Sequence, residues 1–422
     1  MSSISPSAIA LNTNNGALGD PSFLHDHVSV YYHERVQKTW GGGHILRGRR
    51  PTADAVQMRS NDYLAIAGDA RIAAAEIAAL QAFGHGDAIS RVFVHNREDL
   101  LGQFEQRIAR LLGAQDAVLS MSGYCANTGL IQAFARPETP VYIDLRAHAS
   151  LWEGITLAHA TARPFRHNDP EHLERQIRQY GPGIVVVDAL YSTNGEFCPL
   201  VDVVEIGERN GCALVVDETH SFGVQGPRGA GLVVALGLQD RVHFRTVGLS
   251  KAMASRGGIV AGSARNMEFY RYEAFPMMFS TAVLGHEVAG FNAALDILEQ
   301  EDWRRIKLHA SHAYLRAGLD ALGYNVDACD AQIIALESGP EPETLRLREA
   351  LESRDVFGSV FCAPATPKNR SLIRLTVSAQ HSRADLDQVL AACAAIRELI
   401  GVARWASSRR RRGLARLAAA AE

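Results

Sequence analysis

The chain has 422 residues, 47% of them hydrophobic, so it can bury a large core and is too long for one small domain. Its formal net charge of −3 argues against a nucleic-acid-binding protein, because that role usually needs a strongly basic face. The six cysteines are scattered without a Cys-x-x-Cys pair, and no early run is long and apolar enough for a signal peptide or a membrane span, so we expect a cytoplasmic protein with reduced thiols.

The first residues form an arm ahead of the first domain. Residues 1–25 are rich in Ser, Asn and Gly and are expected to be loose. A helical pattern from His25 to Trp40 ends at three consecutive glycines, which break helices. We therefore assign residues 1–55 to an N-terminal arm and helix.

A large domain is expected from residue 56 to residue 285, where short apolar runs alternate with helical patterns. This alternation is typical of parallel strands covered by helices on both faces. The runs are Ala117–Leu119, Val141–Ile143, Ile184–Val187, Ala213–Val216 and His243–Val247. Three of them end in an aspartate, at Asp144, Asp188 and Asp217. Ligands of open α/β sheets gather outside the carboxyl ends of strands, so these ends should form one pocket.

Residues 286–402 change in pattern and predict a smaller α+β domain. The expected helices are 287–301 and 303–322, and the expected strands are 332–336 and 371–377. Residues 403–422 are basic and then Ala-rich, which indicates a loose tail or frayed helix. Four arginines without an aromatic partner do not predict a nucleic-acid or membrane site.

Lys251 is one of only four lysines and lies between an apolar run and a Gly-rich stretch. An amine placed there can be partly desolvated and become nucleophilic, as in lysines that form a Schiff base with a carbonyl cofactor. Asp217 ends an earlier strand-like run. Such a pair suits pyridoxal phosphate, because a carboxylate keeps the pyridine nitrogen protonated while the amine holds the aldehyde. An isolated lysine without this context would more often be a solvated surface residue.

Two stretches offer groups for a phosphate. Ser122 and Gly123 follow a strand and open a helix, where free backbone N–H groups can receive an anion. A Ser-Gly turn that only caps a helix is the commoner alternative. Ser280 and Thr281 supply further hydroxyls suited to a phosphate.

Four other side chains suit the rest of this cofactor and its substrate. His148 follows a strand end and could stack on a flat heteroaromatic ring, although a loop histidine there is commonly structural. His220 and Ser192 could each hydrogen-bond the cofactor's phenolic oxygen. Arg374 lies inside an apolar strand, and a buried guanidinium needs a bidentate anion, either a substrate carboxylate or an internal Asp or Glu.

Taken together, these residues resemble a family, the α-oxoamine synthases among the fold-type I pyridoxal-phosphate enzymes. The likeness includes SNDYL at 60–64, DETHSFG at 217–223, Lys251 and Arg374, and it covers nearly all of residues 55–400. Within the family the sequence is most similar to the quorum-sensing synthases of α-hydroxyketone autoinducers, through the stretches 141–144, 147–154, 180–188 and 356–362.

The resemblance implies an α/β fold with a mostly parallel seven-stranded sheet in the large domain and a smaller α+β C-terminal domain. It implies a homodimer with shared active sites. The roles that it implies are as follows: Lys251 is the Schiff-base lysine, Asp217 the pyridinium partner, His148 the ring-stacking group, His220 and Ser192 the phenolic-oxygen contacts, Gly123 and Tyr124 the phosphate cradle with Ser122 beside them, Ser280 and Thr281 the phosphate hydroxyls of a neighbouring subunit, and Asn61 and Arg374 the holders of the substrate carboxylate.

Two positions depart from the family pattern. Most members carry a threonine where this chain has Gly248, so a phosphate hydroxyl must come from Thr246 or Ser250, or be missing. The usual Gly-Ser-containing loop is replaced here by residues 84–91, GHGDAISR. This second change puts a small amino-acid substrate in question.

The resemblance implies a reaction in which an acyl-coenzyme A with a medium or long chain condenses with an amino acid and carbon dioxide is lost. The family's autoinducer members use 2-aminobutyrate or S-adenosylmethionine, and the product is an α-aminoketone. The alternatives are a housekeeping relative, such as an 8-amino-7-oxononanoate synthase or a 2-amino-3-ketobutyrate coenzyme A ligase, and a scaffold subunit without activity. A metal enzyme is a weaker alternative, because the sixteen histidines show no zinc-binding spacing.

Overall fold

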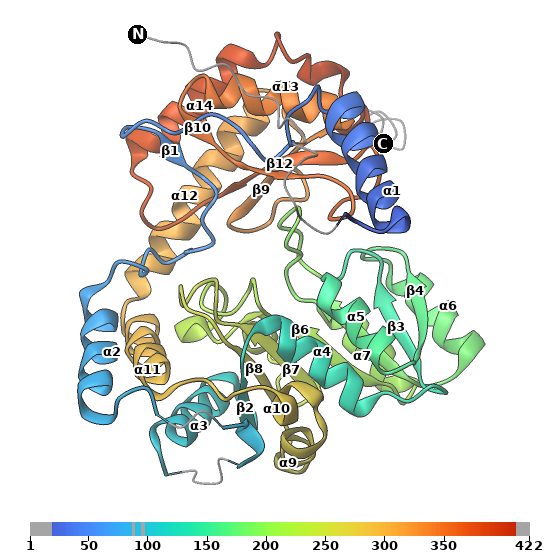
Figure 1. Cartoon of the computed structure of the whole chain (residues 1–422), viewed down its shortest axis with the longest axis vertical. Helices are drawn as coiled ribbons and strands as arrows, with labels where there is room; N and C mark the ends of the chain where they lie inside the picture. Colours follow the sequence, from blue (N-terminus) through green and yellow to red (C-terminus); the bar gives the residue numbers. More distant parts are fainter. Residues whose placement is uncertain (1–18, 87–88, 94–97, 411–422) are drawn as a thin grey trace, which may run out of the picture.

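The structure is a computed structural model that describes residues 19–86, 89–93 and 98–410. It has a larger lobe around one wide sheet and a smaller lobe around a short sheet (Figure 1). This arrangement confirms the predicted fold class, a mostly parallel seven-stranded sheet accompanied by a smaller α+β domain.

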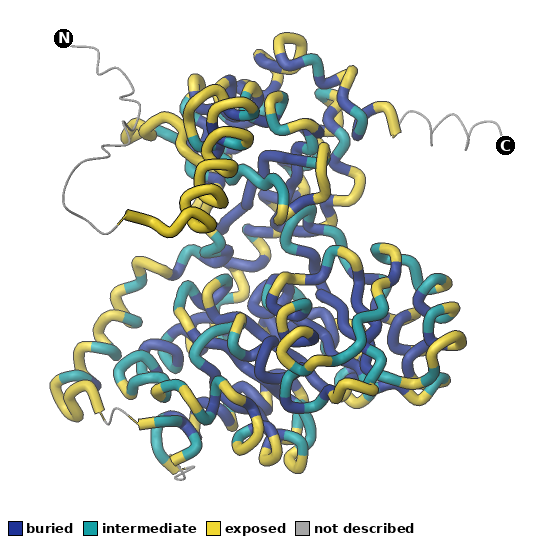
Figure 2. The backbone as a smooth tube through the Cα atoms, turned by 45° about the vertical axis from the view of Figure 1, so that its right-hand side comes forward, coloured by how far each residue is buried: buried dark blue, intermediate teal, exposed yellow. Residues whose placement is uncertain are grey.

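The large sheet has the order β2-β8-β7-β6-β5-β3-β4, in which only β8 runs antiparallel to its neighbours. In this order the strands are Asp116–Ser120, Gly258–Gly262, Phe244–Gly248, Ala213–Asp217, Ile184–Asp188, Pro140–Asp144 and Thr161–Phe165. The inner strands are buried on both faces, as the dark tube in Figure 2 shows, because helices cover both sides. Two of the strands, β4 and β8, were not predicted.

Helices of the large lobe are divided between the two faces of this sheet. One face carries α4 (Gly123–Phe134), α5 (Ala149–Leu157), α9 (Ala264–Glu273) and α10 (Phe275–Phe279). The other face carries α3 (Leu100–Leu112), α6 (Pro170–Tyr180), α7 (Leu200–Arg209), α8 (Leu232–Ala235) and α11 (Gly285–Gln300). The helix α2 (Ala70–Phe83) packs along α11.

The small lobe is built on the antiparallel sheet β11-β12-β9, whose strands are Ser359–Phe361, Ser371–Thr376 and Ile333–Gly339. Its helices are α12 (Asp302–Ala321), α13 (Glu341–Glu352) and α14 (Arg383–Ile396). Short one-turn helices lie at Arg91–Phe93 (η2), Pro227–Gly229 (η3) and Val402–Arg404 (η4). None of the helices in the described ranges is long and apolar enough to cross a bilayer.

The N-terminal arm packs on the small lobe. The helix α1 (Ser22–Val30) continues into a π-helix, η1 (Tyr31–Thr39), where one helix from His25 to Trp40 was expected. Trp40 Nε1 donates to Glu341 at 2.6 Å, and β1 (Val56–Gln57) pairs with β10 (Val356–Phe357). The sequence division placed residues 56–57 at the start of the large domain, whereas their hydrogen bonds run to the small lobe.

The basic tail, for which a loose segment or a frayed helix was expected, begins with ordered structure. Trp405 is buried against Tyr324, and a helical turn from residue 406 brings Arg410 within 2.5 Å of Glu337. Apolar contact and this ion pair hold residues 403–410 on the small lobe. Residues 411–422 lie outside the described ranges.

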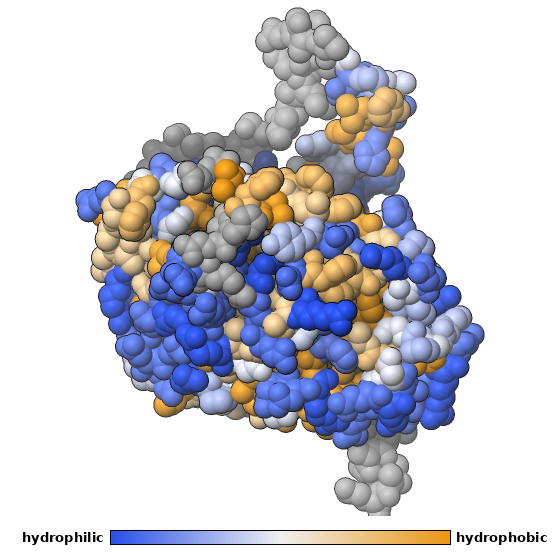
Figure 3. Space-filling view, turned by 90° about the horizontal axis from the view of Figure 1, so that it is seen from below, coloured by the Kyte–Doolittle hydropathy of each residue, from blue (hydrophilic) through white to orange (hydrophobic). Residues whose placement is uncertain are grey.

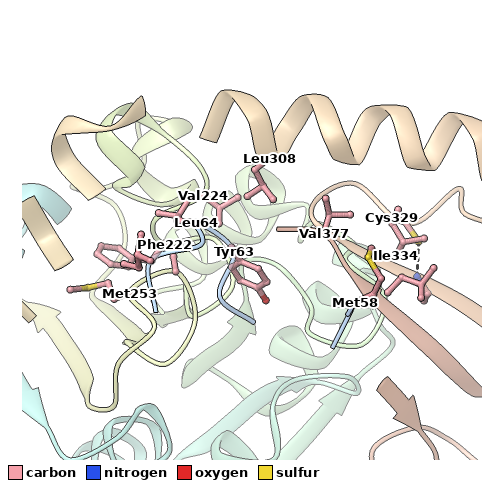
Figure 4. Close-up of a cluster of buried hydrophobic side chains, with 14 of the residues drawn as sticks. Met58, Tyr63, Leu64, Phe222, Val224, Met253, Leu308, Cys329, Ile334 and Val377 are labelled. Atoms are coloured by element: carbon pink, nitrogen blue, oxygen red, sulfur yellow. Dashed lines mark hydrogen bonds between the residues drawn. The ribbon is translucent and has the colours of Figure 1, made fainter. Parts of the chain in front are cut away.

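The two lobes meet at a buried apolar cluster and at one close backbone contact. Tyr63 lies between Phe222 and Val224 of the large lobe and Val377 of the small lobe (Figure 4). Gly195 belongs to the large lobe and Ile333 to β9 of the small lobe. A Cβ at Gly195 would lie 2.2 Å from the carbonyl oxygen of Ile333, so only glycine allows the large lobe to approach β9 this closely. The contact fixes the small lobe over the carboxyl ends of the large sheet.

Candidate active site

The three strand-end aspartates lie on the neighbouring strands β3, β5 and β6, as predicted, and Asp188 stands opposite Asp217 in the register. Each makes different contacts. Asp144 accepts a hydrogen bond from His167 at 2.9 Å, and Asp188 accepts from the backbone N–H of His148. Burial, followed by the nearby Asp217 charge, holds the pKa of Asp188 well above its ordinary value.

Asp217, at the end of β6, is held in place by two hydrogen-bond donors. It is buried, and it accepts from Asn127 Nδ2 at 2.7 Å and from the backbone N–H of Thr219 at 2.8 Å. Asn127 is held in turn by Ser150 Oγ at 2.9 Å. Two donors therefore hold this anion at the end of β6, ready for a cationic ring nitrogen.

Lys251 follows β7 on a turn that a glycine admits. A Cβ at Gly223 would lie 2.3 Å from Cβ of Ala252, so the DETHSFG loop and the lysine turn can touch only because residue 223 is glycine, at a φ of +78°. Glu218 anchors the same loop through a buried ion pair with Arg245. Burial, and then the Arg374 cation, lower the pKa of Lys251, while Asp217 opposes them, so the amine loses its proton more readily than that of an exposed lysine.

The start of α4 forms a cradle with the end of β7. Ser122 Oγ accepts from the Cys125 N–H at 3.0 Å and caps the helix. A Cβ at Gly123 would lie 2.8 Å from the Gly248 Cα, so the two backbones pass each other without side chains. The first N–H groups of α4 can therefore face an anion. Tyr124 is exposed, and its hydroxyl donates to Glu153.

Two histidines stand on different sides of this cradle. His148 is exposed at the start of α5, where its Nδ1 accepts from the Ser150 N–H at 3.3 Å, and its ring meets Tyr124 edge to face. His220 is buried, and its Nδ1 lies 2.6 Å from the hydroxyl of Tyr63. Burial first, and then nearby cations, lower the pKa of His220 well below 6.5, so this ring is neutral near pH 7.

Arg374 lies on β12 and reaches across to the large lobe. Its terminal nitrogens donate to the Ser192 carbonyl oxygen and to Asn61 Oδ1, both at 2.8 Å, and its guanidinium stacks 4.6 Å from the Phe361 ring centre. It is 5% exposed, and its Nε has no hydrogen-bond partner within the described ranges. No Asp or Glu of the described ranges forms an ion pair with it, so the internal carboxylate considered from the sequence is not seen there. A buried guanidinium in this state favours an incoming carboxylate.

The remaining predicted residues lie in different places: at a cavity wall, at the surface, inside β7 and after α10. Ser192 lines the cavity described below, and Ser250 is exposed beside Lys251. The Thr246 hydroxyl is enclosed within β7 without a partner among the described residues. Ser280 and Thr281 follow α10, where Thr281 bridges to Ser90, and no described contact joins them to the Lys251 cluster of the same chain.

A cavity of about 590 Å³ adjoins these residues between the two lobes. His148, Ser192 and Phe361 form the part of its wall nearest the site, and Arg146 and Arg370 lie in the polar part. The loop 84–91 that departs from the family pattern does not line it within the described residues, and positions 87 and 88 lie outside them. No group of three or more His, Cys, Asp or Glu side chains in the described ranges could hold a metal ion.

Three residues contribute to this geometry that the sequence interpretation did not single out. They are Tyr63, which contacts His220, Asn127, which holds Asp217, and Thr219, which contacts both Asp217 and Gly248. Tyr63 and Thr219 lie inside the stretches SNDYL and DETHSFG that carry the family likeness, and Asn127 lies on α4, outside them. Their roles depend on contacts between distant segments, which a single sequence does not display.

Several known proteins are similar to this chain in sequence and in fold. The family model described as aminotransferase class I and II matches residues 53–393. The chain is 41% identical over 373 residues to the CAI-1 autoinducer synthase of Vibrio campbellii, across 88% of this chain and 94% of that protein. It is 37% identical over 343 residues to an 8-amino-7-oxononanoate synthase of Anaeromyxobacter dehalogenans, across 81% and 86% respectively. A solved serine palmitoyltransferase from S. paucimobilis with bound PLP–myriocin aldimine superimposes with a TM-score of 0.80 at 25% identity, over 90% of this chain and 98% of that one.

Proposed function

This chain belongs to the aminotransferase class I and II family, among the pyridoxal-phosphate-dependent α-oxoamine synthases, and on that premise we propose that it joins a medium- or long-chain acyl group to an amino acid. The enzyme class, acyltransferase, and the cofactor follow from the family. The substrates are our proposal: an acyl-coenzyme A, and 2-aminobutyrate or S-adenosylmethionine. The product would be an α-aminoketone precursor of an α-hydroxyketone autoinducer.

The described residues fit pyridoxal phosphate. The cradle between Gly123 and Gly248 has no side chain, and a Cβ on either glycine would fill it, which suits a phosphate at the start of α4. Asp217 is held by two donors at the end of β6, and Lys251 is partly buried with a lowered pKa. When bound, the cofactor supplies an electron sink that acidifies the Cα–H bond of an amino acid.

The chain's own groups would then bind and move protons at defined atoms. Asp217 would keep a ring nitrogen protonated through a charge-assisted hydrogen bond. In the tautomer of His220 that accepts from the Tyr63 hydroxyl at Nδ1, the hydrogen of the neutral imidazole lies on Nε2, from which it would donate to the phenolic oxygen. His148 would stack on the cofactor ring, and Lys251 Nζ would accept the Cα proton as the general base.

The observation that carries the amino-acid half of this proposal is the buried Arg374. Its guanidinium has no carboxylate partner among the described residues, and Asn61 and the Ser192 carbonyl oxygen hold it in place. A substrate carboxylate bound there would be oriented by charge-assisted hydrogen bonds. In the condensation, the Cα forms a bond with the thioester carbonyl carbon and the coenzyme A thiolate leaves.

A substrate panel tests the proposal. Purified enzyme loaded with cofactor would be assayed with glycine, alanine, 2-aminobutyrate and S-adenosylmethionine against octanoyl-, decanoyl- and pimeloyl-coenzyme A. We expect 2-aminobutyrate or S-adenosylmethionine with an unbranched medium chain to exceed the other pairs in kcat/KM by roughly tenfold or more, the discrimination that a few methylenes provide. Thiol release measures the rate, and mass spectrometry identifies the ketone. Turnover confined to glycine or alanine would contradict it.

The second candidate is an 8-amino-7-oxononanoate synthase, which the likeness to the Anaeromyxobacter dehalogenans enzyme favours. That candidate predicts a preference for alanine and pimeloyl-coenzyme A. The polar part of the cavity, where Arg146 and Arg370 lie, would offer cations for a terminal carboxylate. The same panel therefore decides between the two.

We also propose that the active form is a homodimer in which Ser280 and Thr281 reach the partner's cofactor phosphate. Large apolar side chains are exposed around these hydroxyls, on η2 and α10: Phe93 is 67%, Phe275 53% and Phe279 75% exposed. From below, this end of the molecule carries apolar areas between charged ones (Figure 3). Burying such side chains against a second copy is favourable.

Replacing Phe279 with Asp tests the dimer. Because a charge would be buried at the proposed interface, Phe279→Asp should move the particle from twice the chain mass toward 45.8 kDa and weaken cofactor binding. Light scattering after size exclusion measures the mass. The matched control is Leu399→Asp, which changes a side chain that is 72% exposed on the small lobe and should leave the dimer intact. A dimeric Phe279→Asp protein would refute this interface.

A further inference from the structure

Residue 248 is a glycine, and the side chain of Thr219 lies where a side chain at position 248 would be. Thr219 Oγ1 accepts a hydrogen bond from the Gly248 N–H at 2.8 Å. A Cβ on Gly248 would lie 2.9 Å from the Thr219 methyl carbon and 3.2 Å from its Oγ1. The two side chains would therefore clash: a residue larger than glycine at position 248 would require the Thr219 side chain to move.

The hydroxyl of Thr219 can still donate a hydrogen bond. Its oxygen accepts from Gly248, and no acceptor for its proton is found among the described residues. The side chain is partly exposed, so a ligand can reach it. A Cβ built on Gly123, the first residue of α4, would lie 3.9 Å from Thr219 Oγ1, which places the hydroxyl at the start of that helix.

We propose that Thr219 is a positioning residue whose hydroxyl donates to the cofactor phosphate held at the start of α4, in place of the hydroxyl that Gly248 lacks. The inference rests on the proposed cofactor site. Its backbone N–H meanwhile donates to Asp217 at 2.8 Å. One residue therefore links the phosphate end of the cofactor to the carboxylate that faces its ring nitrogen.

The two other candidate hydroxyls are placed differently. Thr246 Oγ1 is buried on β7 and forms no hydrogen bond with any described residue. Ser250 is exposed next to Lys251, and no hydrogen bond fixes its side chain among the described residues. Thr219 is the candidate whose oxygen is already anchored, by Gly248, and whose proton is available.

Comparing pyridoxal phosphate with pyridoxal isolates a contact to the phosphate. In apoenzyme, Thr219→Ala should weaken pyridoxal phosphate binding about ten- to a hundredfold, the effect of a lost hydrogen bond to a charged group, and leave pyridoxal binding unchanged. The matched control Thr219→Ser, which keeps the hydroxyl, should bind both ligands like the wild type. Absorbance titration measures both dissociation constants. Equal weakening of the two ligands, or no weakening, would overturn the assignment, whereas wild-type protein that binds neither would refute the cofactor site itself.

An exchange of the two positions gives a second, independent test. Gly248→Thr alone should bind pyridoxal phosphate poorly, because its side chain meets the Thr219 methyl group. The double change Gly248→Thr with Thr219→Ala removes this clash and restores a hydroxyl, so it should recover most of the affinity lost in Thr219→Ala. Should Thr219→Ala fail to fold, the double variant still decides. A folded double variant that binds as weakly as either single change would contradict the proposal.

Discussion

Lys251→Ala should lower turnover by at least about a thousandfold, the combined effect of losing a covalent anchor and a general base. The physical reason is the position of this amine, partly buried at the end of β7 with its pKa lowered by burial and by Arg374. Water or a distant side chain cannot take the Cα proton from the same place. Turnover is measured by thiol release from the acyl-coenzyme A at saturating cofactor.

The covalent role has a readout that does not depend on activity. Wild-type protein treated with borohydride should gain the cofactor mass on the peptide that contains Lys251 and lose its long-wavelength absorbance, whereas Lys251→Ala should show neither change. The matched control is Lys38→Ala, because Lys38 is exposed on η1 and forms a surface ion pair with Glu34. Full turnover in Lys251→Ala would refute the whole mechanism.

The parts of the fold that the sequence revealed are those with strong local patterns. The apolar runs at β5 and β6 are covered on both faces, so their composition alone predicts strands. The edge strand β4 (Thr161–Phe165) was missed because only its last residue is buried and it contains a proline and an arginine. The strand β8 (Gly258–Gly262) was missed because glycines begin and end it.

The site residues also differ in whether a local sequence pattern predicts them. Lys251, Asp217 and Arg374 could be predicted because each places a charge at or inside an apolar strand-like run, which is rare without a functional or paired charge. Asn127 and Tyr63 could not, because each acts through a residue that is distant in the sequence, at Asp217 and His220. Contacts of this kind arise from the packing of helices and loops, and no local pattern encodes them.

Arg374→Gln should reduce kcat/KM for the amino acid by roughly a hundredfold or more, because a buried carboxylate would lose its charged partner, a cost of about 3 kcal/mol. The KM for the acyl-coenzyme A should change little, since the guanidinium is proposed to bind the carboxylate of the amino acid. Arg374→Lys should recover only part of the loss, because an ammonium cannot hold a carboxylate in a bidentate pair. Steady-state kinetics with each substrate varied in turn measures this separation, and equal losses for both substrates would indicate general disruption instead.

The same change should alter the titration of Lys251. Burial and the Arg374 cation both disfavour the ammonium form, so the pKa of Lys251 lies below 10.5, and removing the cation must raise it while burial keeps it under that value. With only four lysines in the chain, ¹³C-methylated apoenzyme gives few signals, and Lys251→Ala assigns the one of interest. A pKa of Lys251 that stays fixed or falls in Arg374→Gln would show that the guanidinium does not repel the ammonium form of Lys251. A rise would show that the residue that binds the carboxylate also favours the unprotonated base, which couples substrate binding to proton removal.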